Sequence, residues 1–135
     1  MPLKKYFLFG LILLAVLLVG CTKAVVKLDT PIQINYQDSL TINDKLSLKF
    51  SNVTEDSRCP EGAQCIWEGR ITIVLEVIEN GEKTGELSLS NNPRDEMQVQ
   101  GINEYTITLI DVKPYPKIDN PFNKTDYVAT INVSK

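Results

Sequence analysis

The chain contains no histidine among its 135 residues. Without an imidazole it has no Ser-His-Asp or Cys-His catalytic arrangement, no histidine proton shuttle and no histidine-ligated metal site. Basic residues are also few, since 14 Lys and Arg stand against 17 Asp and Glu and the net charge is −3. A nucleic-acid surface needs clustered cations. We therefore predict no nucleic-acid partner.

Charged side chains are missing from a long stretch near the amino terminus. Lys4 and Lys5 are followed by residues 6–20, which are rich in Leu, Val, Ile and Phe. As a helix this stretch would span roughly 22 Å, which is shorter than the ~30 Å core of a bilayer. Such a length is typical of the apolar core of a signal peptide rather than of a permanent membrane helix. We predict that residues 1–20 are a signal peptide.

The apolar stretch ends in Leu18-Val19-Gly20-Cys21, which resembles the lipobox of bacterial lipoproteins. The resemblance implies transfer of diacylglycerol to the Cys21 sulfur, cleavage before Cys21 and acylation of the new amino group. A second or third acyl chain matters because one chain gives only marginal membrane binding. We expect a lipid-anchored protein on the extracytoplasmic face of the cell membrane or outer membrane. An uncleaved short anchor with an incidental cysteine is the alternative.

Beyond a tether at residues 21–30, residues 31–135 alternate apolar and polar side chains with a period of two. The stretch 70–79 carries apolar residues on both faces, which is typical of a central strand. Asn80-Gly81 follows it directly and is a favoured pair for a type I′ hairpin turn. No segment shows the i, i+3, i+4, i+7 spacing of an amphipathic helix.

The pattern predicts about seven strands at intervals of roughly 8–12 residues. Their expected ranges are 32–36, 46–51, 70–79, 86–90, 97–99, 105–112 and 127–133, with Gly101 ending the fifth. This pattern indicates one all-β domain, an antiparallel two-sheet sandwich of immunoglobulin-like type. A small β-barrel is the alternative.

Cysteine is scarce, and with Cys21 assigned to the lipid only Cys59 and Cys65 are left. An even pair outside the cytoplasm predicts one disulfide bond. Closing so short a ring stabilises the fold by roughly 2 kcal/mol, so its main effect is to fix the loop. A redox-active pair is disfavoured, because such pairs usually have Cys-x-x-Cys spacing at a helix N-terminus.

The stretch Asp56-Ser57-Arg58-Cys59-Pro60, followed by Cys65, Trp67 and Gly69, forms a motif of its own. It resembles Asp-Ser-Arg-Cys-Pro…Cys-x-Trp-x-Gly, a signature of small secreted or lipid-anchored bacterial β-domains. The resemblance extends more loosely to Tyr105–Pro116. It implies a β-domain at the cell envelope, and it implies no activity.

Four residues of this stretch, Arg58, Pro60, Glu61 and Trp67, make up a candidate binding loop. We interpret Arg58 as pairing with Glu61 or the nearby Asp56, which would hold the loop in place. The alternative is an exposed Arg58 that fills the acidic pocket of a trypsin-like protease, which would make the protein an inhibitor of secreted serine proteases.

Trp67 is the one tryptophan of the chain. Continued alternation would place it on the same face as Cys65 and Gly69, so we expect it to pack over the disulfide in the core. The alternative is a surface platform for a partner, because aromatic rings anchor interfaces and stack on sugars.

We predict no catalytic residue, no cofactor and no metal site. The loop carboxylates could in principle form an acid–base pair, but their composition is that of a solvated loop. The oxygen-bearing residues of 119–126 match no calcium-loop spacing and are ordinary in turns. The sequence thus favours a non-enzymatic binding or scaffolding module, anchored in the membrane by its lipid, for an envelope protein or a glycan.

We predict that protein extracted from membranes lacks residues 1–20 and carries an acylated Cys21 at its amino terminus. Mass spectrometry of the intact protein measures both properties. A Cys21→Ser variant removes the sulfur nucleophile, so we expect it to remain unprocessed. Recovery of soluble protein that retains Met1 would contradict the prediction.

Overall fold

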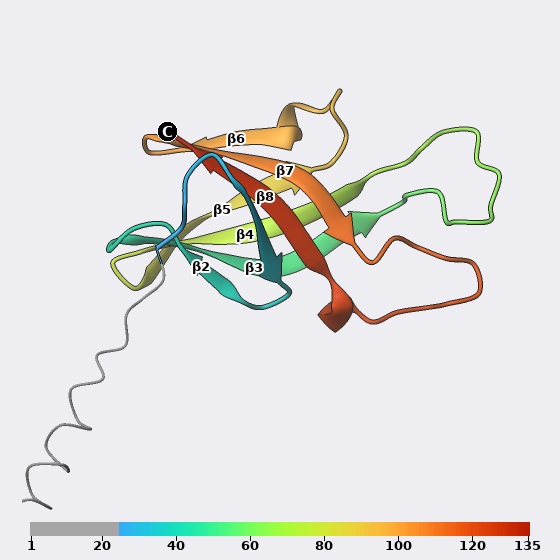
Figure 1. Ribbon diagram of the computed structural model, residues 1–135, viewed down its shortest axis with the longest axis horizontal. Coiled ribbons are helices and arrows are strands. Elements are labelled where there is room, and N and C mark those ends of the chain that lie inside the picture. Colours follow the sequence, from blue (N-terminus) through green and yellow to red (C-terminus); the bar gives the residue numbers. More distant parts are fainter. Residues whose placement is uncertain (1–24) are drawn as a thin grey trace, which may run out of the picture.

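The structure is a computed structural model that describes residues 25–135 (Figure 1). The predicted signal peptide, residues 1–20, and the lipidation site Cys21 lie outside the described residues. The elements follow in the order β1 (Pro31–Asn35), β2 (Ser39–Thr41), β3 (Leu46–Asp56), β4 (Ile71–Glu79), β5 (Glu82–Ser90), η1 (Glu96–Gln98), β6 (Val99–Ile102), β7 (Tyr105–Lys113), η2 (Lys124–Asp126) and β8 (Val128–Ser134).

The strands form two antiparallel four-stranded sheets, with orders β1-β8-β7-β6 and β2-β3-β4-β5. The sheets are not closed into a barrel, so the predicted all-β sandwich is confirmed. The architecture is immunoglobulin-like in its two packed antiparallel sheets. Its connectivity is that of two meanders, because β2–β5 follow one another in one sheet and β6–β8 in the other.

The core lies between the sheets and takes alternate residues from most strands. In β3, Leu48 and Phe50 are fully buried, and in β8 Ile131 and Val133 are fully buried. Residues 71–75 of β4 are all buried, and β4 pairs with β3 on one side and β5 on the other. The prediction that this strand is central is therefore confirmed.

Two details of the predicted strands were wrong. Met97 lies in the short 3₁₀ helix η1, because the Asp95 side chain accepts a hydrogen bond from the Met97 amide and caps a turn there. Gly101 lies inside β6, paired with Thr106 of β7, rather than ending the strand. The described residues also contain an eighth strand, β2, which is three residues long.

The turn between β4 and β5 has the predicted form. Asn80 and Gly81 have φ of 52° and 85°, so both occupy the left-handed region that a type I′ turn requires. The flanking residues Glu79 and Glu82 are directly paired, which leaves only two residues in the turn.

Part of the expected tether packs against the sandwich. The Val26 amide donates to the Thr41 carbonyl at 3.3 Å, and the Asp29 amide donates to the Val133 carbonyl at 2.8 Å. Val26 and Leu28 also contact the core. The packed domain therefore includes residues 26–30, which the predicted boundary assigned to the tether. No helix among residues 25–135 is long and apolar enough to cross a membrane.

The sandwich has two different ends (Figure 1). One end carries the loops 57–70, 91–95 and 114–123, and we call it the loop end. Residue 25 enters at the opposite end, beside the short turns that precede β3, join β4 to β5 and join β6 to β7. The motif-bearing loop therefore lies far from the point where the amino-terminal segment joins the domain.

Candidate binding site at the loop end

The loop 57–70 begins as an extension of the β3–β4 hairpin. The Ser57 amide donates to the Arg70 carbonyl at 2.8 Å, and the Cys59 amide donates to the Glu68 carbonyl at 3.0 Å. Gly69 makes this close approach possible. Its φ is +67°, and a Cβ at this position would lie 1.8 Å from the Ser57 carbonyl oxygen. Only glycine fits there, which explains why the motif ends in glycine.

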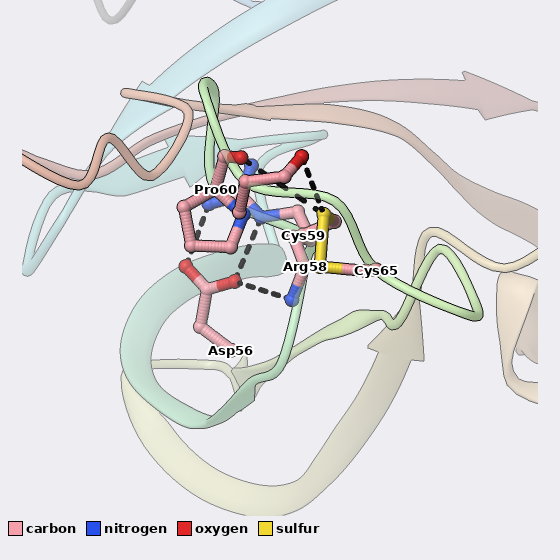
Figure 2. The surroundings of a disulfide bond; sticks show 6 residues. Asp56, Arg58, Cys59, Pro60 and Cys65 are labelled. Carbon is pink, nitrogen blue, oxygen red and sulfur yellow. Dashed lines mark hydrogen bonds and ion pairs between the residues drawn. A yellow bond between two sulfur atoms is a disulfide. The ribbon is translucent and has the colours of Figure 1, made fainter.

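The predicted disulfide between Cys59 and Cys65 is present, with the two Cα atoms 5.9 Å apart (Figure 2). Within the ring, the Ala63 amide donates to the Pro60 carbonyl at 3.0 Å and closes a turn. Pro60 thus shapes the ring, as its place in the motif suggests.

The ring also docks against the loop 114–123. The Glu61 amide donates to the Pro116 carbonyl at 2.9 Å, and the Glu61 carboxylate lies 3.2 Å from Lys117 Nζ. Glu61 therefore pairs with Lys117 and not with Arg58. The two loops are held together by backbone contacts as well as by charge.

Arg58 is buried at the base of the loop, with a side chain only 2% exposed. Its Nε and Nη2 atoms donate to the two Asp56 carboxylate oxygens at 2.8 Å and 2.7 Å (Figure 2). Nη1 donates to the Val112 carbonyl at 2.6 Å, and Nη2 also donates to the Pro114 carbonyl at 3.1 Å. The interpretation that Arg58 pairs with Asp56 is confirmed, and the same guanidinium ties β3 to the end of β7.

Tyr127, just before β8, completes this cluster by donating its hydroxyl to the Asp56 carboxylate at 2.8 Å. Burial alone would raise the pKa of Asp56, but the hydrogen bonds from Arg58 and Tyr127 outweigh it and hold that pKa below its usual value. Burial and the bond to Asp56 raise the pKa of Tyr127 to about 12. Asp56 is therefore ionised and Tyr127 protonated at neutral pH.

This placement of Arg58 does not match the exposed arginine that the protease-inhibitor alternative assumed. An inhibitory arginine must be exposed to enter an acidic specificity pocket, whereas all polar contacts of Arg58 are directed into its own domain. Releasing it would leave Asp56 buried without a cation, which is strongly unfavourable.

Trp67 does not pack in the core, so that expectation was wrong. Its side chain is 76% exposed, and the neighbouring Ile66 is 94% exposed. Strand alternation ends with β3 at Asp56 and resumes with β4 at Ile71, so it does not extend to residue 67. The alternative reading of Trp67 as a surface residue fits the structure.

An open groove of about 820 Å³ lies beside Trp67. Residues of all three loops of the loop end line it, among them Ile66, Trp67, Glu68, Asn91, Asn92, Arg94 and Tyr115. Tyr115 lies with its ring 4.9 Å from the Arg58 guanidinium carbon and is still 39% exposed. The buried Arg58 therefore positions an aromatic side chain of the groove.

Arg70 joins the loop 91–95 to the site. Its Nε atom lies 2.8 Å from the Glu55 carboxylate, and its Nη1 atom lies 3.0 Å from the Asp95 carboxylate. Hydrogen bonds from Arg70 and Ser57 hold the pKa of Glu55 below its usual value. These groups connect β3, β4 and the loop that carries Asn91 and Asn92.

No group of three His, Cys, Asp or Glu residues within residues 25–135 is arranged to hold a metal ion. Among the oxygen-bearing residues of 119–126, the Asp126 carboxylate accepts a hydrogen bond from the Asn123 amide at 2.8 Å and caps η2. That carboxylate therefore has a structural role in its own turn.

Sequence reasoning missed the groove residues outside the motif. Tyr115 stands between Pro114 and Pro116, and an aromatic residue held between two prolines in a loop is a signal that could have identified it. Asn91 and Asn92 fall between the predicted strands 86–90 and 97–99. Nothing in the linear order indicated that their loop lies beside Trp67.

No family model, curated protein or solved structure matches the chain. The resemblance of residues 56–69 to the bacterial envelope signature therefore stays a prediction.

We predict that Arg58→Met lowers the free energy of unfolding by about 3–5 kcal/mol at pH 7, because it leaves Asp56 buried without its cation. In the wild-type protein the folded pKa of Asp56 lies below the unfolded one. Its contribution to stability is thus present above pH ~4 and is lost as the pH falls through the folded pKa. In the variant, burial raises that pKa, so the destabilisation should shrink at pH 3.

Urea unfolding at pH 7 and pH 3 measures this effect. Lys117→Met is the control, because it breaks only the exposed pair with Glu61 and should change stability by less than about 0.5 kcal/mol. An equal loss for Arg58→Met at both pH values would argue against the buried ion pair.

We predict that Gly69→Ala destabilises the protein by about 2–4 kcal/mol, because a left-handed φ and an overlap with the Ser57 carbonyl add together. Gly81→Ala is the matched control, since Gly81 also has a positive φ but a Cβ there would meet nothing within 4 Å. Denaturant unfolding should show a clearly smaller loss for the control. Equal losses would mean that the Gly69 contact is unimportant.

Proposed function

We propose that the protein is a lipid-anchored, non-enzymatic binding module of the cell envelope and that the loop end contacts its partner, an envelope protein or a glycan. One observation carries the proposal: Trp67 and Ile66 are strongly exposed on a loop that is itself firmly held. The anchor is the one that the lipobox-like sequence around Cys21 predicts.

The exposed apolar side chains gather at the loop end. Of the large hydrophobic residues that are exposed among residues 25–135, four lie in its loops: Ile66, Trp67, Tyr115 and Ile118. Isolated exposed hydrophobic residues are ordinary on a protein surface, but a cluster that includes a tryptophan and a tyrosine is typical of an interface. This clustering supports a partner at the loop end.

The loop that presents Trp67 is constrained in three independent ways. The Cys59–Cys65 bond closes the ring, Gly69 brings the two sides of the loop together, and the Arg58–Asp56 pair fixes its base. A loop that is ordered before binding loses little conformational entropy when a partner binds. Such rigidity is useful to a binding surface and has no evident value for a passive linker.

The position of the loop end suits display away from a membrane. β3 has 11 residues and runs from near the end where residue 25 enters to the loop end. At about 3.3 Å per residue the strand spans roughly 36 Å. A lipid on Cys21 would therefore leave Trp67 on the side of the domain opposite its anchor.

Two acidic groups of the site are poorly suited to act as general acids. A general acid needs a carboxyl whose pKa is raised toward neutrality. Glu55 and Asp56 instead have pKa values below their usual ones, because Arg70 and Arg58 hold them as anions. Both carboxylates thus serve to position arginine side chains.

We predict that a photoreactive phenylalanine analogue at position 66, in the full-length chain, forms a cross-linked adduct when intact cells of the native host are irradiated. The same analogue at position 99 is the control, because Val99 is also exposed but lies in β6 and does not line the groove. Electrophoresis of membrane extracts detects the adducts. Adducts that are absent, or equally abundant at both positions, would refute a partner at the loop end.

A further inference from the structure

The aromatic and polar lining of the groove points to a chemical class of ligand. We propose that the groove binds a neutral saccharide chain, which stacks on Trp67 and Tyr115 and forms hydrogen bonds with polar side chains of the same lining. This inference rests on the proposed function, since it names the partner of the same site.

Two aromatic side chains from different loops line the groove. Trp67 belongs to the loop 57–70 and Tyr115 to the loop 114–123, and both are exposed. Tyr115 is held in place because its ring lies over the Arg58 guanidinium, which four hydrogen bonds to Asp56, Val112 and Pro114 immobilise. The apolar C–H faces of a sugar ring pack well on such rigid aromatic surfaces.

The polar lining offers hydrogen-bonding groups suited to hydroxyls. The Asn91 Oδ1 atom accepts from the Ile71 amide at 2.9 Å, and the Asn92 Oδ1 atom accepts from the Arg94 amide at 3.0 Å. With both oxygens engaged by the backbone, each side chain keeps its amide nitrogen as a donor. The exposed Glu68 carboxylate adds an acceptor beside Trp67.

The groove has no excess of positive charge, which disfavours an anionic ligand. Arg58 is paired with Asp56, and Arg70 is paired with Glu55 and Asp95. Two charged lining residues form no ion pair within residues 25–135, namely Glu68 and Arg94, one of each sign. A phosphate-bearing or polyanionic ligand would need an excess of unpaired cations.

The groove also lacks what an extended peptide would use. Peptides that add to a β-sheet need a free strand edge. Loop residues form almost all of the lining, and Glu55 of β3 is the one strand residue in it. The volume of about 820 Å³ lies within the range of small-molecule sites. The lining as a whole therefore fits a polyhydroxylated ligand better than a strand-like one.

Trp67 makes the test direct, because it is the one tryptophan in the chain. The full-length protein, in a detergent without a sugar head group, is titrated with neutral hexasaccharides of glucose and of N-acetylglucosamine. We expect at least one of them to change the fluorescence of Trp67 in a saturable way and to give a matching calorimetric titration. A polyphosphate of similar length should produce no saturable change.

Variants separate the groove from the rest of the surface. Trp67→Ala and Tyr115→Ala should each weaken saccharide binding, measured by calorimetry, by at least about tenfold. Val99→Ala and Ile110→Ala are matched controls, since both residues are exposed and apolar but do not line the groove, and they should leave binding unchanged. Equal effects in all four variants would overturn the proposal.

The failure of this inference can be told apart from that of the proposed function. If neither hexasaccharide binds at concentrations up to about 10 mM, the saccharide proposal is overturned. An adduct from position 66 that proves to be a protein would then leave the binding module intact with a different partner. Tighter binding of polyphosphate than of the hexasaccharides would likewise overturn the choice of a neutral ligand.

Discussion

The buried ion pair between Arg58 and Asp56 is the contact on which the loop end depends. Its guanidinium joins the end of β3 to the carbonyls of Val112 and Pro114, and Tyr127 reaches the same carboxylate from the start of β8. One charged pair thus connects the two sheets where their longest loops begin. Because both charges are nearly excluded from water, each requires the other.

The position of Tyr115 in the groove depends on this ion pair. Arg58 lies under the ring of Tyr115, and its pair with Asp56 lies at the base of the loop that carries Trp67. A binding surface usually needs such support from residues that do not touch the ligand, because they fix the side chains that do. Here the supporting residue, Arg58, belongs to the motif, whereas Tyr115, which lies against it, does not.

The strands could be predicted because the alternation of side chains is a local property of a strand. The segments of β3, β4, β7 and β8 are long enough to show it, and the Asn80-Gly81 turn depends only on its own two residues. β2 has three residues, too few to show a period. Gly101 was misread because its pairing with Thr106 across the β6–β7 hairpin keeps it inside the strand.

Sequence alone was enough for the all-β sandwich, for the Cys59–Cys65 bond and for the pairing of Arg58 with a carboxylate nearby in the chain, since these rest on periodicity or on residues close together in the chain. Only the packed structure decided that Trp67 is exposed and that it shares a groove with Tyr115 and Asn91. The reason is physical: Arg58 meets its other partners 54 and 56 residues away, and such contacts exist only once the two sheets have packed.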